Sequence, residues 1–228
     1  KKFNDNTRLE LGWSSRINDR LSKASGFNHL TGKDIAAYYN EFDFADQVHA
    51  LYATYGTRIN NFSLQGGLRG EYYRGESTTK PAETAQPIIN SYFQIFPSLF
   101  LSYSLPKSNE VQLNITRRVN RPWGRQVNSF RDYSDSTNIS YGNPALTPEF
   151  ASVMELNYLK NWDNHSVSST IYYRFTDDVM QRVSFMRDGV MESTFMNLTK
   201  KRDVGVELVA KNRLFKFLNL TSSVNLYR

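Results

Sequence analysis

The sequence predicts an all-β fold, namely a segment of an antiparallel transmembrane β-barrel with about 9–10 meandering strands. Runs of about ten residues carry apolar side chains at every second position. This is the period of a strand, because successive side chains point to opposite faces. Short and long connectors alternate between these runs, as in membrane-spanning barrels. Only 39% of the residues are hydrophobic, and a barrel needs apolar residues only on the lipid-facing half of each strand.

Five runs show the alternation most clearly. Val111, Leu113 and Ile115 share one face, and the residues between them are polar. The same pattern is present in Phe62, Leu64 and Leu68, in Leu99, Leu101 and Tyr103, in Val167, Ile171 and Tyr173, and in Leu218, Leu220 and Val224. By this criterion we expect nine strands, in the order 8–17, 44–55, 61–74, 92–105, 110–119, 152–161, 166–185, 190–211 and 217–228.

The connectors fall into two length classes. The short ones are 56–60, 106–109, 162–165 and 212–216, and they contain Gly, Pro, Asn and Asp, which tolerate turn geometry. The long ones are 19–43, 75–91 and 120–151. Asp188-Gly189 predicts the two-residue turn of a tall hairpin. Its strands are longer than the 9 to 11 residues that cross a bilayer, so we expect their outer part to project into the medium.

Several classes of protein are excluded by what the sequence lacks. It has no run of 18 apolar residues, so it is not a helical membrane protein. It has no cysteine and therefore no disulfide framework. The net charge of +6 is spread along the chain, so we expect no nucleic-acid partner. Three dispersed histidines and the absence of any catalytic motif predict no metal site, no cofactor and no enzymatic activity.

One segment carries a family resemblance. Arg-x-Asn-Arg-Pro at 118–122 precedes a loop that closes with Gly-Asn-Pro-x-Leu-x-Pro-Glu at 142–149, and Glu-Leu-x-Tyr follows at 155–158. This order resembles the barrel of TonB-dependent receptors and the outer-membrane β-barrel family related to them. The resemblance is strongest over 92–228 and matches no plug domain. We therefore expect 1–228 to form a partial outer-membrane barrel domain without a plug.

The resemblance implies a location, partners and a function. The location is the bacterial outer membrane, with its lipid as one partner. Long extracellular loops such as 120–151 would bind an unknown nutrient for import. A TonB-type protein would supply energy through a plug domain that is not in this chain.

The same segment also has candidate site residues, for which two interpretations stay open. In the first, Asn143, Pro144, Pro148 and Glu149 form a structural motif between loop and strand, because proline lacks an amide donor and fixes the chain direction. Glu149 could then pair with Arg118 or Arg121. In the second, four arginines form part of a cationic lining that attracts an anionic or polar solute; these are Arg117, Arg121, Arg125 and Arg131.

Two other functions remain as alternatives to nutrient import. One is a passive porin or surface-adhesion barrel, and the other is a soluble β-sandwich that binds glycans through exposed aromatic residues. Nine strands is an odd number, whereas single-chain bacterial barrels have an even one, so we expect a part of a larger barrel. The first residues lack the apolar stretch of a secretory signal, which predicts a trimmed protein or a fragment. Its open strand edges are expected to self-associate without detergent.

Overall fold

The computed structural model describes residues 2–4, 6–80, 86–215 and 217–228 and consists almost entirely of strands. The long strands are β2 (Thr7–Asn28), β3 (Lys33–Ile59), β4 (Phe62–Lys80), β5 (Ile88–Leu105), β6 (Asn109–Asn120), β8 (Glu149–Trp162), β9 (His165–Arg187), β10 (Val190–Phe215) and β11 (Leu218–Tyr227). The short elements are β1 (Lys2–Asn4), β7 (Asn138–Ser140) and the 3-10 turn η1 (Gly124–Gln126).

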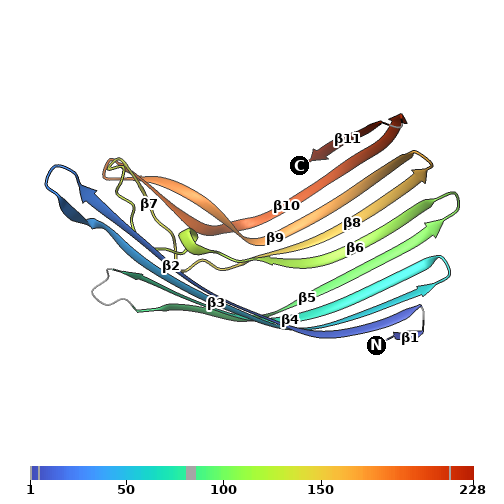
Figure 1. Ribbon diagram of the computed structural model, residues 1–228, viewed down its shortest axis with the longest axis horizontal. Coiled ribbons are helices and arrows are strands. Elements are labelled where there is room, and N and C mark those ends of the chain that lie inside the picture. Colours follow the sequence, from blue (N-terminus) through green and yellow to red (C-terminus); the bar gives the residue numbers. More distant parts are fainter. Residues whose placement is uncertain (1, 5, 81–85, 216) are drawn as a thin grey trace.

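The strands form one curved sheet. Each long strand pairs antiparallel with the next one along the chain, and β7 pairs in parallel with β10. The sheet forms an open trough, with β2 to β5 as one wall and β9 to β11 as the other (Figure 1). Within the described residues β1 and β11 lie at opposite ends of the strand order, and the sheet does not close. This arrangement confirms the predicted antiparallel barrel segment.

The nine predicted strands correspond one to one to the nine long strands. The short turns gather at one end of the trough, and the β2–β3 and β9–β10 hairpins lie at the other (Figure 1). At the tip of the second hairpin, Asp188 and Gly189 have φ angles of 51° and 80°. Both are left-handed, as the predicted two-residue turn requires.

Two of the predicted long connectors are wrong, because much of their length is strand. Residues 19–28 and 33–43 continue β2 and β3, which leaves a turn at 29–32. Residues 75–80 and 88–91 likewise extend β4 and β5. Beyond the predicted span, polar residues such as Glu41 and Asp43 replace the apolar ones on the outer face, while Phe42 is buried on the inner face. The outer-face alternation that marks the span therefore stops, although the hydrogen-bond ladder continues. The rest of the predicted connector 75–91 includes 81–85, and the predicted turn 212–216 includes 216; these residues lie outside the described ranges.

The strand register sorts side chains into rows across the sheet. One row is entirely apolar and consists of Leu64, Leu101, Leu113, Leu156, Ile171, Val206 and Leu226. The adjacent row is entirely polar and consists of Ser63, Ser102, Gln112, Asn157, Thr170, Glu207 and Asn225. Neighbouring residues of a strand point to opposite faces. The sheet therefore has an apolar outer face and a polar inner face.

The apolar face is uncovered. Leu156, Ile171 and Leu226 are 46%, 51% and 69% exposed, and the described strands form one sheet with no second layer over this face. A sandwich would bury these residues against a second sheet, so the soluble β-sandwich alternative is wrong. None of the described helical segments is long and apolar enough to cross a membrane.

The two faces can be distinguished by adjacent substitutions. We expect Leu113→Arg to lower the free energy of unfolding by about 2–4 kcal/mol, because it places a cation in lipid. Gln112→Arg, one residue away on the inner face, should cost less than about 1 kcal/mol. Urea titration of the protein folded in lipid vesicles measures both values. Equal losses would contradict this assignment of the faces.

Glu41, in the part of β3 outside the predicted membrane span, makes stability dependent on pH. Its carboxylate accepts hydrogen bonds from Lys23 Nζ at 2.9 Å, Lys80 Nζ at 3.1 Å and Tyr39 Oη at 3.1 Å. The bonds from Lys23, Lys80 and Tyr39, in that order, lower the pKa of Glu41 from its ordinary 4.5 to about 2. A lowered carboxyl pKa contributes stability above the ordinary value, and this contribution is lost as the pH falls through the folded value.

We therefore expect the wild-type protein to lose stability between pH 4.5 and about 2, and Glu41→Gln to remove part of that pH dependence. Unfolding midpoints measured across this range test the expectation. Glu76→Gln is the matched control, since Glu76 is more exposed and, among the described residues, its ion pair is with the neighbouring Arg74 at 3.3 Å. A pH profile of Glu41→Gln identical to that of the wild-type protein would refute it.

Candidate functional site

The segment 121–148 between β6 and β8 forms the candidate site, and we call it the inner loop. It contains η1 and β7 and lies between the two walls of the trough, nearer the end with the long hairpins (Figure 1). β7 pairs with the start of β10 through Ser140 and Ser193, and Met191 N donates to Thr137 O at 2.9 Å. The inner loop thus adds a short strand, β7, to the sheet beside the start of β10.

Apolar side chains from both halves of the inner loop hold it against the sheet. Val127 and Leu146 are 4% and 1% exposed and form a cluster with Phe42 and Phe44 of β3. Met180 of β9 and Phe195 of β10 pack against this cluster. Removing such side chains from water is favourable by roughly 1.5–3 kcal/mol each. The cluster therefore joins both walls of the trough through the loop.

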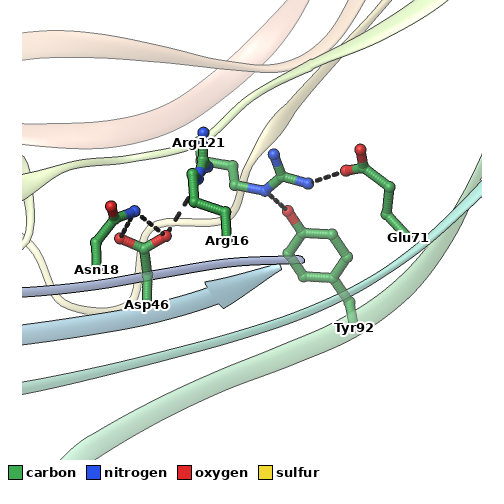
Figure 2. A network of polar contacts seen from close by, with 6 residues as sticks. All are labelled: Arg16, Asn18, Asp46, Glu71, Tyr92 and Arg121. Atoms are coloured by element: carbon green, nitrogen blue, oxygen red, sulfur yellow. Dashed lines mark hydrogen bonds and ion pairs between the residues drawn. The ribbon is translucent and has the colours of Figure 1, made fainter. Parts of the chain in front are cut away.

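Arg121 fixes the first end of the inner loop. Its Nε donates to Tyr92 Oη at 2.7 Å, and its Nη2 is bonded to the Glu71 carboxylate (Figure 2). The guanidinium also lies over the ring of Tyr73, at 5.2 Å from the ring centroid. Arg69 Nε donates to the other oxygen of Glu71 at 2.6 Å. Because the Glu71 side chain is only 10% exposed, these charge-assisted bonds offset the cost of its burial.

A second polar group lies beside the first on the inner face. Asp46 accepts two bonds from Asn18 Nδ2, at 3.1 and 3.2 Å, and Arg16 Nη2 lies 3.9 Å from it (Figure 2). Val48, two residues along β3 from Asp46, pairs with Tyr73 of β4. The two groups therefore lie near one another on the inner face, with the buried residues Val48 and Tyr73 between them. Each group contains both an arginine and a carboxylate.

Arg131 fixes the central part of the inner loop to β10. Its Nη1 and Nη2 donate to the two oxygens of Glu192 at 3.2 and 3.0 Å, and Tyr141 Oη donates to Glu192 at 2.9 Å. Arg187 approaches the same carboxylate at 3.8 Å. Burial opposes ionisation of Glu192, but the bonds from Tyr141 and Arg131 and the charges of Arg131 and Arg187 lower its pKa overall. Two cations therefore share one carboxylate at this place.

The predicted structural motif lies where the loop enters β8. Asn143 Nδ2 donates to Phe195 O at 3.0 Å, and Pro144 O accepts a bond from Asn90 at 3.2 Å. Pro148 borders a cavity of about 20 Å³ beneath the loop, room for about one water molecule. The role of these residues as a loop-to-strand motif stays a prediction.

Glu149 has partners other than the expected arginines. Its Oε2 accepts from Asn120 Nδ2 at 2.8 Å, and its Oε1 accepts from the Met180 backbone amide at 2.5 Å. Arg121 instead reaches Glu71. The expected pairing of Glu149 with Arg121 is wrong, because the inner loop carries Arg121 across to β4 while Glu149 stays between β6 and β9.

The four predicted arginines do not converge on one point. Arg121 and Arg131 have carboxylate partners on different strands, Glu71 of β4 and Glu192 of β10. The Arg117 guanidinium lies 5.1 Å from the centroid of the Phe150 ring, and Arg125 is exposed on η1. Their role as a solute-attracting lining stays a prediction. The sequence did not predict Glu71 and Glu192 as partners of these arginines. Each is an isolated acidic residue at an inward position of its strand, and this position was the signal that could have identified it.

The described residues contain no group of three or more His, Asp or Glu side chains that could hold a metal ion. His49 instead bonds Ser15 at 2.7 Å, and His165 bonds Asn212 at 2.9 Å. The chemistry that the site offers is non-covalent. Guanidinium, phenol and amide groups suit recognition of a polar or anionic solute.

Comparisons of sequence identify relatives at the level of a family. The sequence profile of the outer membrane protein beta-barrel family matches residues 1–228. A comparison with curated proteins gives no match. The family match confirms the predicted fold class and the predicted location, the bacterial outer membrane.

Similar solved structures include three membrane transporters or receptors. The copper transporter OprC is 15% identical, with a TM-score of 0.71, and the match covers 98% of this chain and 36% of that one. The siderophore receptor PiuA from Acinetobacter baumannii is 12% identical, with a TM-score of 0.69, over 100% of this chain and 36% of that one. The ferric yersiniabactin uptake receptor FyuA from Yersinia pestis is 14% identical, with a TM-score of 0.65, over 99% and 33%.

The chain spans about a third of the length of these three proteins. At such identities the likeness is one of fold. The family and these neighbours are described as barrels, transporters and receptors, and none of them as an enzyme. This agrees with the expectation that the chain is not an enzyme.

The two loop arginines Arg121 and Arg125 provide a test of how the inner loop is held. We expect Arg121→Ala to destabilise the docked loop by about 1–3 kcal/mol, because Glu71 loses one of its two charged partners. Arg125→Ala, which removes an exposed arginine of the same loop, should leave the stability of the docked loop nearly unchanged. Limited proteolysis within 121–148 measures the population of undocked loop. Equal cleavage of the two variants would show that Arg121 does not anchor the loop.

Proposed function

The chain belongs to the outer membrane protein beta-barrel family, and on that premise we propose that it is the barrel portion of an importer whose extracellular loops bind a nutrient. The observation that carries the proposal is the inner loop. It is held to the sheet at Arg121, at Arg131 and through the buried side chains of Val127 and Leu146. A loop held in this way presents a defined surface to a solute that enters from the long-hairpin end.

The part of the inner loop around Arg131 is the best candidate for the first contact with a solute. Arg131 is 36% exposed in its side chain and Arg187 58%, whereas Glu192, which they share, is 5% exposed. The accessible atoms of this group are therefore mainly cationic. Tyr141 lies against Arg131, with the guanidinium 4.7 Å from the ring centroid. Such a surface favours an anionic solute with flat or aromatic parts.

The neighbours suggest which nutrients to try first. OprC is named a copper transporter, PiuA a siderophore receptor and FyuA a ferric yersiniabactin receptor. Metal chelates are accordingly the first class to screen, and anionic chelates fit the arginines Arg117, Arg121, Arg125 and Arg131 of the predicted lining. Energy would come from a TonB-type protein through a plug domain, which these 228 residues do not resemble.

A passive porin is the second candidate. It is favoured by the inner loop itself, because a loop that packs across the inner face narrows the channel without any plug. Uptake by a porin would continue after the proton gradient is collapsed, whereas uptake by an energised receptor would stop.

Uptake measurements on cells that carry the full-length protein test both candidates. We expect labelled anionic metal chelates to enter, a protonophore to abolish uptake, and Arg131→Ala to weaken binding about 10-fold or more, as for a lost charge-assisted bond. Glu192→Gln is the matched control, because it also loosens the loop but leaves the cation in place. Equal losses in both variants would assign Arg131 to loop bracing alone. Uptake that persists with the protonophore would favour the porin.

A further inference from the structure

A broad hollow lies on the outer face of β2 to β5, on the opposite side of the sheet from the polar cluster of Figure 2. Its volume is about 960 Å³, and we call it the outer groove. Two rows of paired residues cross it, one formed by Leu11, Ala53 and Leu68 and the other by Trp13, Leu51 and Gly70. Leu68 has the same strand parity as Leu64 of the apolar row, so the groove belongs to the lipid-facing surface.

Small residues beside large ones create the hollow. Gly70 and Ala53 leave space between Trp13, Leu51 and Phe93, which are 69%, 71% and 62% exposed. A Cβ at Gly70 would lie 3.0 Å from the Phe93 ring, so the ring packs directly over Gly70 and forms this side of the groove. Seven large apolar or aromatic residues in all line the groove. A flexible chain without polar groups can follow this surface with no unpaired hydrogen-bonding atoms.

Polar residues begin at one end of the groove. Ser15 and His49 are bonded at 2.7 Å and lie level with Tyr72, which pairs with His49. Arg74 is two residues further along β4, about 7 Å at the rise of a strand, and has the same orientation as Tyr72. Its side chain is 47% exposed, and its ion pair with Glu76 is 3.3 Å long. A phosphate placed here would meet a cation, while an attached hydrocarbon chain would run back over Gly70.

We propose that the outer groove binds one acyl chain of an anionic phospholipid, with the phosphate beside Arg74. The lipid would be retained specifically, in contrast to the exchanging lipids around the rest of the barrel. The argument is independent of import, because it uses only the outer face. A peptide segment is a poorer occupant, since its backbone would face these apolar side chains with unpaired N–H and C=O groups.

Tryptophan quenching tests the proposal on the full-length protein in lipid vesicles. Trp13 is kept as the reporter in this chain by Trp123→Phe and Trp162→Phe, with other tryptophans of the protein replaced likewise. The vesicles contain phosphatidylcholine and increasing fractions of phosphatidylglycerol with brominated acyl chains. We expect half-maximal quenching at a mole fraction about 5-fold or more below that of random contact, as for a chain held by an apolar groove.

Variants that fill the groove complete the test. Gly70→Leu should return quenching to the random value, and Ala53→Leu serves the same purpose if Gly70→Leu does not fold. Gly66→Leu is the matched control, because Gly66 is on the same strand and face and a Cβ there meets nothing within 4 Å. Arg74→Gln should remove the preference for phosphatidylglycerol over brominated phosphatidylcholine.

The proposal is overturned if the wild-type protein shows random quenching, including the case in which a second copy covers the groove. It is also overturned if Gly70→Leu, Ala53→Leu and Gly66→Leu behave alike. If Arg74→Gln keeps the full preference, the placement of the phosphate is wrong. None of these outcomes depends on nutrient uptake.

Discussion

The constraint on which the rest of this structure depends is the continuous register of its nine long strands. Within a bilayer no water can satisfy a free N–H or C=O group, so every backbone group must be paired with the next strand. A slip of one residue would exchange the two faces of a strand. The register that forms aligns Leu101, Leu113 and Leu156 in one row. The polar row beside it then faces inward, because neighbouring residues of a strand point to opposite faces.

The inner loop makes use of that polar face. Ordering a segment of this length costs roughly 1–2 kcal/mol of backbone entropy per residue, and the loop offsets this cost through spaced contacts. Val127 and Leu146 bury apolar surface against β3, and Arg121 and Arg131 bind carboxylates of β4 and β10. Because the anchors are on β4 and β10, the loop position depends on both walls of the trough. A solute that competes for Arg131 would therefore also loosen one anchor.

The same strands carry different chemistry on their two sides. On β3 and β4, Asp46 and Glu71 face the inner cluster, whereas Leu51 and Gly70 face the outer groove. A single layer of strands separates the two surfaces. Lipid on one side and solute on the other can therefore be examined by separate substitutions, provided that the backbone pairing between them is intact.

The sequence by itself determined the number of long strands, the side of the sheet that faces lipid and the turn of the tall hairpin. These follow from local rules, since alternation and turn residues act within a few positions. It did not predict that 19–43 is mostly strand, because the apolar outer face of the span stops before residues such as Glu41 and Asp43, and pairing with neighbouring strands then decides. It identified Arg121 and Arg131 but not their partners Glu71 and Glu192, which are 50 and 61 residues away. Only the folded sheet brings such residues together, because the path of the inner loop is set by packing against distant strands.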